Sequence, residues 1–249
     1  ALAIKPDFPQ ALNNLSGALN HLERREEGEA ACRRAIELKP DYAEAHVNLA
    51  LFLFRKGRLK EAWDEYEWRW RSENSHLWRD LPQTLWQGED LAGKTVLVWA
   101  EQGVGDEIMF AGMIPDLIET GARVTLECDH RLVPLYQRSF PGVECIARGE
   151  SAILDTCHEN INFQVPVGNL GRWFRANLDS FPKRSSFLKA DKDRTVALKT
   201  RYQEIFPDKH IIGLSWRSGS QLTGAGRSIP LADWLPILSH PRCAFVSLQ

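Results

Sequence analysis

Residues 95–119 have the sequence TVLVWAEQGVGDEIMFAGMIPDLIE, and this stretch decides the fold class of the chain. Its first five residues are a short apolar, β-branched run bounded by polar residues, which predicts a buried strand. A glycine-rich turn follows at 101–105. Apolar residues then recur at helical spacing from Ile108, which predicts a helix that begins near Asp106. A strand, a glycine-rich turn and a helix are the first unit of a doubly wound α/β domain, in which ligands bind at the carboxyl ends of the strands.

The glycine-rich turn has the composition of a ligand-binding loop but matches neither common nucleotide motif. The third glycine of the dinucleotide fingerprint is replaced by Ile108, and the Lys-Ser/Thr pair of a P-loop is absent. Glycine lets a backbone turn sharply and approach a ligand, and the free N–H groups of a new helix favour anions. We expect substrate contacts from Glu101, Gly103, Val104 and Gly105.

Asp106 is the distinctive residue of this stretch, because it places a carboxylate at the junction of the turn and the helix. Aspartate is well suited to cap a helix N-terminus, and spacing alone favours that interpretation. A functional role for this carboxylate also stays open at this point.

Composition limits the classes of protein to consider. The chain has 249 residues, of which 43% are hydrophobic and 26% charged, as in soluble globular proteins of one large or two to three small domains. A net charge of -2 gives no broad surface for nucleic acid, and no apolar run approaches the length of a membrane span. Five scattered cysteines without a C-x-x-C pair predict reduced thiols in a cytoplasmic protein, with no disulfide frame and no metal site. These cysteines are Cys32, Cys128, Cys145, Cys157 and Cys243.

Residues 1–75 repeat themselves with a period of 34 residues, since IELKPDY at 36–42 echoes IKPDF at 4–8. Small residues stand at Gly28 and Ala62, where paired helices would cross. This pattern closely resembles the tetratricopeptide family, whose helix pairs bury their faces by stacking. Such repeats imply a peptide or protein partner, held by polar residues of the concave face. A solvated helix surface is the simpler alternative for the candidates Asn13, Asn14, Asn48 and Arg55.

Six of the nine tryptophans lie between residues 63 and 99. Exposed coplanar rings would suit sugar stacking. The neighbouring leucines favour a packed junction between the helical repeats and the α/β domain, in which Trp63, Trp70 and Trp86 are buried. The prolines and glycines at 76–93 predict an extended connector without strands.

The rest of the chain alternates between strand and helix patterns. Further strands are predicted at 123–127, 143–147 and 161–165, which gives a parallel sheet within residues 94–190. Residues 191–249 begin a second unit of the same kind, with a helix at 193–206 and strands at 211–216 and 244–248. The polar loop at 217–228 contains two arginines, three glycines and several hydroxyls, which suit either phosphate binding or a mobile surface loop.

The segment from Trp86 to Gln249 resembles a glycosyltransferase domain of the GT-B type. It resembles lipopolysaccharide heptosyltransferases, and its layout with repeats is also similar to O-linked N-acetylglucosamine transferase. The motifs that carry the resemblance are WAEQGVGD at 99–106, SWRSG at 215–219, RSIPL at 227–231 and FVSLQ at 245–249. The resemblance implies two Rossmann-like domains after the repeats, the second one truncated here, and both chain ends resemble interrupted elements of a longer protein.

The same resemblance implies a reaction and its residues. Such enzymes move a sugar from a nucleotide-sugar to an acceptor hydroxyl, with inversion and without a metal or other cofactor. Asp106 occupies the position of the general base. The donor diphosphate would contact Arg217, Ser218, Gly219, Ser220 and Arg227. The alternative is a non-catalytic scaffold in which a degenerate Rossmann-like domain accompanies the repeats.

Overall fold

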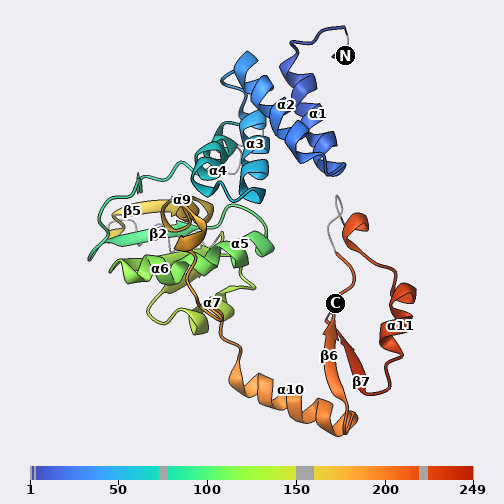
Figure 1. Cartoon of the computed structure of the whole chain (residues 1–249). Coiled ribbons are helices and arrows are strands. Elements are labelled where there is room, and N and C mark those ends of the chain that lie inside the picture. Colours follow the sequence, from blue (N-terminus) through green and yellow to red (C-terminus); the bar gives the residue numbers. More distant parts are fainter. Residues whose placement is uncertain (1, 3, 73–77, 150–159, 219–223, 249) are drawn as a thin grey trace. The chain divides into compact units, whose positions relative to one another are not determined.

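The computed structural model describes residues 2, 4–72, 78–149, 160–218 and 224–248. The chain divides into two compact units, Ala1–Lys189 and Ala190–Gln249, and each is described by itself. The first unit contains the repeats together with a five-stranded parallel sheet (Figure 1).

The predicted repeats are present as four helices, of which successive ones pack against each other (Figure 1). The crossing of the helices requires a residue without a side chain at Gly28, because a Cβ atom there would lie 2.5 Å from the ring of Phe52. Gly57 has a φ of 72° and makes the left-handed turn between the last two helices. The helices are α1 (Pro9–His21), α2 (Arg25–Leu38), α3 (Ala43–Arg55) and α4 (Leu59–Tyr66).

The sheet has the strand order β1-β5-β2-β3-β4, and every pair is parallel. The four predicted strands are found as β2 (Thr95–Trp99), β3 (Arg123–Cys128), β4 (Glu144–Ala147) and β5 (Phe163–Pro166). The expectation of a connector without strands is wrong. Two of its residues form β1 (Thr84–Leu85) and pair with the free edge of β5, where their backbone groups find partners.

One face of the sheet is covered by helices α5 (Val104–Phe110), α6 (Ile114–Glu119), α7 (Val133–Ser139) and α9 (Leu170–Phe174). Their apolar side chains form one core with Val96 and Val98 of β2. The single helix predicted after β2 is divided into α5 and α6 by a short 3-10 turn, Ala111–Met113. Pro115 lies in the first turn of α6, where its missing N–H group costs nothing.

The opposite face of β2 carries Leu97 and Trp99, and the connector covers it where a doubly wound domain has helices. Half-buried Trp70 packs against the Trp99 ring with centroids 5.7 Å apart, and the two ring planes are inclined by 50°. Trp63 and Trp86 are buried, so the packed-junction prediction is confirmed for these two rings. Rings this steeply inclined form no coplanar platform for sugar stacking.

The second unit contains the predicted order of elements on a smaller scale. A two-stranded parallel sheet joins β6 (His210–Leu214) and β7 (Cys243–Ser247). Helix α10 (Lys192–Ile205) precedes the sheet and α11 (Leu235–Leu238) lies between its strands in sequence. Asp191 caps α10 by accepting the N–H of Arg194 at 2.8 Å.

Candidate functional site

The turn after β2 places Asp106 inside a helix rather than before one. Helix α5 begins at Val104, and its N-cap is Gly103, which makes no side-chain capping bond. The interpretation of Asp106 as the N-cap is therefore wrong, because the chain becomes helical two residues earlier. Its carboxylate folds back toward the turn, since a Cβ atom at Gly103 would lie 3.6 Å from Asp106 Oδ2. Among the described residues, no hydrogen bond or ion pair to this carboxylate is found.

Asp106 lines a pocket of about 650 Å³ between the repeats and the α/β region of the first unit. This volume lies within the range of small-molecule sites, roughly 300–1,000 Å³. Helices α3 and α4 supply one wall, α5 supplies another, and residues 181–187 complete the rim. The lining residues are Leu51, Phe54, Leu59, Trp63, Tyr66, Gln102, Asp106, Met109, Phe110, Gly112, Met113, Arg175, Phe181, Pro182, Arg184 and Phe187.

The pocket is apolar and open. Met109 and Phe181 are 60% and 51% exposed, although both are large apolar side chains on its lining. Such exposed apolar side chains around a hollow indicate a surface that binds another molecule.

The cationic groups of the pocket are already paired. Arg175 and Arg184 both donate to Asp116, with N–O distances of 2.8 and 3.0 Å to Oδ2. Asp106 has no such partner among the described residues, so its carboxylate is available to a ligand in the pocket.

Tyr66 also lines this pocket and carries an acidic hydroxyl. Its hydroxyl accepts a hydrogen bond from the side-chain amide of Gln102. Burial raises the pKa of Tyr66, and the positive charge of Arg69 partly opposes this effect. The negative charges of Glu101 and Asp106 add to the rise. The phenol therefore stays protonated near neutral pH and can donate a hydrogen bond.

Glu101 lies at the start of the turn but does not face the pocket. Its carboxylate accepts two hydrogen bonds from Arg69, at 2.8 and 3.0 Å, and a third from the N–H of Gly168 at 2.9 Å. The side chain is 1% exposed. Both carboxylate oxygens of Glu101 are thus engaged by groups of the protein itself.

The other predicted residues of the turn have varied surroundings. Val104 is partly buried against the main core, whereas Gly103 and Gly105 are exposed. A Cβ atom at Gly105 would meet nothing within 4 Å, and Gly103 has an ordinary φ of −79°. The backbone conformation of the turn therefore does not require either glycine. Because neither residue has a side chain, the space beside Asp106 stays open.

Glu107, next to Asp106 in α5, points away to the edge of the sheet. Its buried carboxylate accepts the N–H of Asp129 at 2.8 Å and a guanidinium N–H of Arg148 at 2.6 Å. Burial raises the pKa of Glu107, and these two donors partly oppose that effect. The side chain thereby fixes α5 to the segments that follow β3 and β4.

The predicted phosphate loop belongs to the second unit. The N–H of Ser218 donates to Ser228 Oγ at 3.0 Å, and that hydroxyl donates to the carbonyl of Gly224 at 2.6 Å. The first of these bonds joins Ser218 to Ser228. The exposed residues Arg217 and Arg227 are the chain neighbours of these two serines. Gly219 and Ser220 lie outside the described residues.

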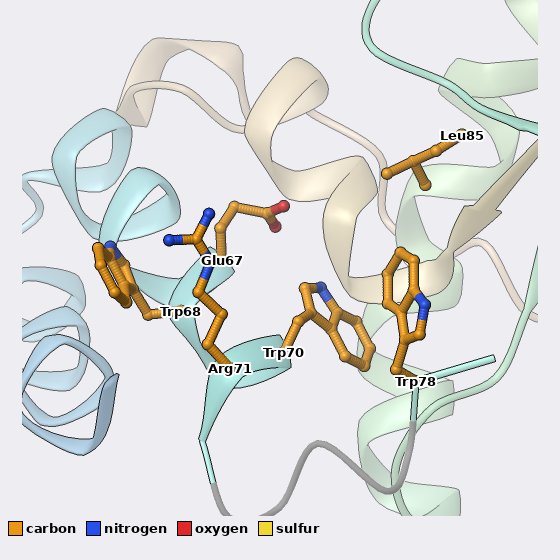
Figure 2. A pocket seen from close by; sticks show the side chains of 6 residues that line it. All are labelled: Glu67, Trp68, Trp70, Arg71, Trp78 and Leu85. Atoms are coloured by element: carbon orange, nitrogen blue, oxygen red, sulfur yellow. The ribbon is translucent and has the colours of Figure 1, made fainter. Parts of the chain in front are cut away.

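A second hollow of about 420 Å³ lies among the tryptophans, where Figure 2 shows the rings of Trp70 and Trp78 inclined to each other. Several of its lining side chains contact other parts of the protein. Glu67 accepts bonds from Arg69 and Asn169, and the Trp68 ring stacks on His46 at 3.9 Å. This hollow belongs to the packed junction.

The sequence analysis missed the walls of the Asp106 pocket. Tyr66 and Phe54 occupy positions that look like ordinary repeat core, and Phe181 lies in a polar stretch without a motif. No signal in the chain joins these three segments, because their approach depends on how the repeats pack against the sheet. In the described residues, no group of three or more His, Cys, Asp or Glu side chains is arranged to hold a metal ion. Nor does any helix in that part of the chain have the length and apolar character needed to cross a membrane.

The Tetratricopeptide repeat family matches residues 31–64, and these residues form the second half of α2, all of α3 and most of α4. Over these residues the chain is similar to that family. Protein FlbA from Caulobacter vibrioides is 31% identical over 266 residues, which cover 100% of this chain and 44% of FlbA. The chain thus spans less than half the length of this relative. The Peroxisomal targeting signal receptor of Eremothecium gossypii is 40% identical over 62 residues, which are 25% of this chain and 11% of the receptor.

Among solved structures, a Thermobaculum terrenum O-GlcNAc transferase mutant matches at 13% identity and a TM-score of 0.27. The match covers 66% of this chain and 40% of that one.

Proposed function

We propose that the chain is part of a glycosyltransferase of the GT-B type, similar to heptosyltransferases, which moves a sugar from a nucleotide-sugar to an acceptor hydroxyl. One observation carries the proposal. Asp106 follows the carboxyl end of a central parallel strand, lines an open pocket, and has no charged partner among the described residues. In parallel sheets of this kind, ligands bind at that edge.

The proposed chemistry uses groups of the chain itself. Asp106 takes the proton of the acceptor hydroxyl while the oxygen attacks the anomeric carbon of the sugar. The bond from that carbon to the phosphate oxygen breaks, and the nucleotide leaves with the electron pair, so the anomeric configuration inverts. Arg217 and Arg227 of the second unit are the candidates to bind the phosphates of the nucleotide-sugar, and the proposed reaction requires no metal or other cofactor.

The acceptor would occupy the pocket beside Asp106. Once an acceptor fills this open pocket, the apolar walls would keep water from the attacking oxygen, which strengthens the electrostatic interactions of the carboxylate there. Gly103, Val104 and Gly105 would border the acceptor. The repeats would bind a peptide or protein, because their helices build one wall of the same pocket. The unpaired thiols among the described residues fit a reducing compartment such as the cytoplasm, and the balanced charge offers no surface to nucleic acid.

The test is Asp106→Asn in the full-length protein, assayed with a panel of nucleoside diphosphate and monophosphate sugars. The amide keeps the size of the carboxyl group but takes no proton. We expect transfer to fall roughly a hundredfold or more, while stability changes by less than about 1 kcal/mol. Asp193→Asn is the matched control, because Asp193 also lies in the first turn of a helix but is exposed. Transfer by Asp106→Asn at near the parent rate would refute the catalytic role.

A second candidate is a non-catalytic scaffold that binds a polypeptide. The exposed apolar side chains of Met109 and Phe181 favour it, because a purely polar acceptor would not need them. The parent protein would then bind a peptide but neither transfer nor hydrolyse any sugar of the panel. Met109→Ser would weaken such binding, whereas under the first candidate it raises the KM for the acceptor.

A further inference from the structure

The end of the repeats holds the turn that carries Asp106. Tyr66 is the last residue of α4, and Arg69 lies three residues later in the 3-10 helix Glu67–Arg71. Residues three apart on a helix project from the same side. Their side chains contact two successive residues of the turn, with Tyr66 bonded to Gln102 and Arg69 bonded to Glu101.

The Arg69–Glu101 contact is buried and geometrically fixed. The side chains are 9% and 1% exposed, and two guanidinium nitrogens donate to the two carboxylate oxygens. The guanidinium carbon also lies 4.2 Å from the ring centre of Tyr66 and 4.1 Å from that of Trp70. The guanidinium of Arg69 is hydrogen-bonded at its edge and packed against two rings, so it is held in one orientation. This in turn fixes the position of the Glu101 carboxylate.

The same pair joins the ends of two neighbouring strands. Glu101 follows β2 and accepts the N–H of Gly168, which follows β5, while Arg69 also donates to the side chain of Asn169. Because β2 and β5 are adjacent and parallel, both contacts lie at the carboxyl edge of the sheet, where the pocket opens.

Packing alone does not explain this arrangement. Desolvating a buried ion pair costs about as much free energy as the pair regains, so apolar residues would stabilise the same junction equally well. A hydrogen-bonded ion pair differs from apolar packing because it also fixes the positions of the two side chains. Here those partners begin the six-residue segment from Glu101 to Asp106.

We propose that Arg69 and Tyr66 are positioning residues for sugar transfer, which makes the last repeat a structural part of the catalytic half of the molecule. This inference rests on the proposed function. By fixing Glu101 and Gln102, the two residues direct the Asp106 carboxylate toward the pocket. Their loss slows transfer even to an acceptor that binds without help from the repeats.

The test uses Tyr66→Phe and Arg69→Lys in the full-length protein. The first change removes only the hydroxyl that Gln102 contacts, and the second keeps the charge but loses the two-point contact. Tyr42→Phe is the matched control for the hydroxyl, since Tyr42 accepts a bond from Asn13 within the repeats. Arg79→Lys is the control for the guanidinium, because Arg79 pairs with buried Glu127 of β3.

The first measurement is amide hydrogen exchange in peptides that cover residues 100–110. We expect exchange to become about fivefold faster in both variants, as for the loss of one hydrogen bond, and to stay unchanged in both controls. Tyr66→Phe also covers the case in which Arg69→Lys folds poorly, because deletion of one partly exposed hydroxyl leaves the buried pair intact.

The second measurement separates kcat from KM. A displaced base slows the chemical step, so we expect kcat to fall about tenfold or more while the KM for the nucleotide-sugar stays the same. Gln102→Met in the Tyr66→Phe background should cause no further loss, because both changes remove the same bond.

The outcomes distinguish the two ideas. A parent protein that transfers no sugar overturns the proposed function. If the parent is active, unchanged exchange in both variants overturns the inference alone, and so does faster exchange with an unchanged kcat. Faster exchange together with a lower kcat and an unchanged KM supports it.

Discussion

Strands β2 and β6 have similar sequences and opposite surroundings. Each is a five-residue run of mainly β-branched or apolar residues followed by a glycine-containing loop. In β2 the residues from Val96 to Trp99 are completely buried, whereas Ile211 and Ile212 of β6 are 38% and 36% exposed. A strand's own sequence therefore specifies its conformation, while its burial depends on what pairs with it and covers its faces.

The helices repeat this contrast. Helix α6 buries Ile114 and Leu117 against the five-stranded sheet, but α10 has no buried residue along its fourteen positions. The core that fixes the first unit is supplied by strands on both sides of β2, by helices on one face and by the connector on the other. In the described part of the second unit, β6 pairs with β7 alone.

The largest expected difference comes from truncating a central strand residue in each unit. Leu97→Ala empties a fully buried site between Trp99 and the connector, and should lower the free energy of unfolding by about 2–5 kcal/mol. Ile212→Ala, in the partly exposed β6, should cost less than about 1 kcal/mol. Urea unfolding followed by tryptophan fluorescence compares the two. Equal losses would mean that β6 is as well covered as β2.

A smaller difference is expected for added volume at two glycines. A Cβ atom at Gly171 would lie 2.1 Å from the Trp63 ring, which is itself packed between α4 and α9, so Gly171→Ala should cost about 1–3 kcal/mol. At Gly213 the nearest atom is the end of the exposed Leu248 side chain, 2.8 Å away, which can move aside. Thermal unfolding of Gly213→Ala should match the parent, and a comparable loss in both variants would contradict this account.

The smallest effect concerns pH. The buried Glu107 has a raised pKa, so the folded state binds its proton more tightly than the unfolded state does. Stability should therefore fall as the pH rises from the ordinary carboxyl range through the raised pKa. Glu107→Gln should remove this part of the slope, whereas Glu204→Gln on exposed α10 should leave it intact. An unchanged slope in urea titrations between pH 4 and 7 would show that Arg148 and the N–H of Asp129 fully compensate the burial.

The sequence was sufficient for features that depend on local patterns. The 34-residue period predicted the repeats, and β-branched runs located β2, β3 and β5 to within two or three residues. It failed where the outcome depends on distant partners. The pairing of β1 with β5, the cover of Trp99 by the connector and the pocket of Asp106 all depend on how separate segments approach one another.

The candidate site shows the same limit at the level of single residues. The turn was found from its glycines, yet the residue that fixes it, Arg69, lies in a stretch of alternating charges and tryptophans that resembles a solvated helix end. Helix α5 begins at Val104, two residues before the predicted start near Asp106, and Asp106 is therefore not the N-cap residue. A pattern of residue types carries too little information to place a boundary so exactly.

The close packing of Trp63 against Gly171 limits where the repeats of this protein can be replaced by other repeats. Repeat arrays can be recombined as modules. If the junction with a new repeat array were placed after residue 72, however, Trp63 would be replaced together with the repeats, although its ring fits against Gly171 of α9. A more tolerant place lies earlier, at the turn from Lys39 to Asp41 between α2 and α3, provided that the new helix keeps a glycine where Gly28 meets Phe52. An exchange there would supply new recognition helices and leave α3, α4 and the Arg69 contact with the sheet unchanged.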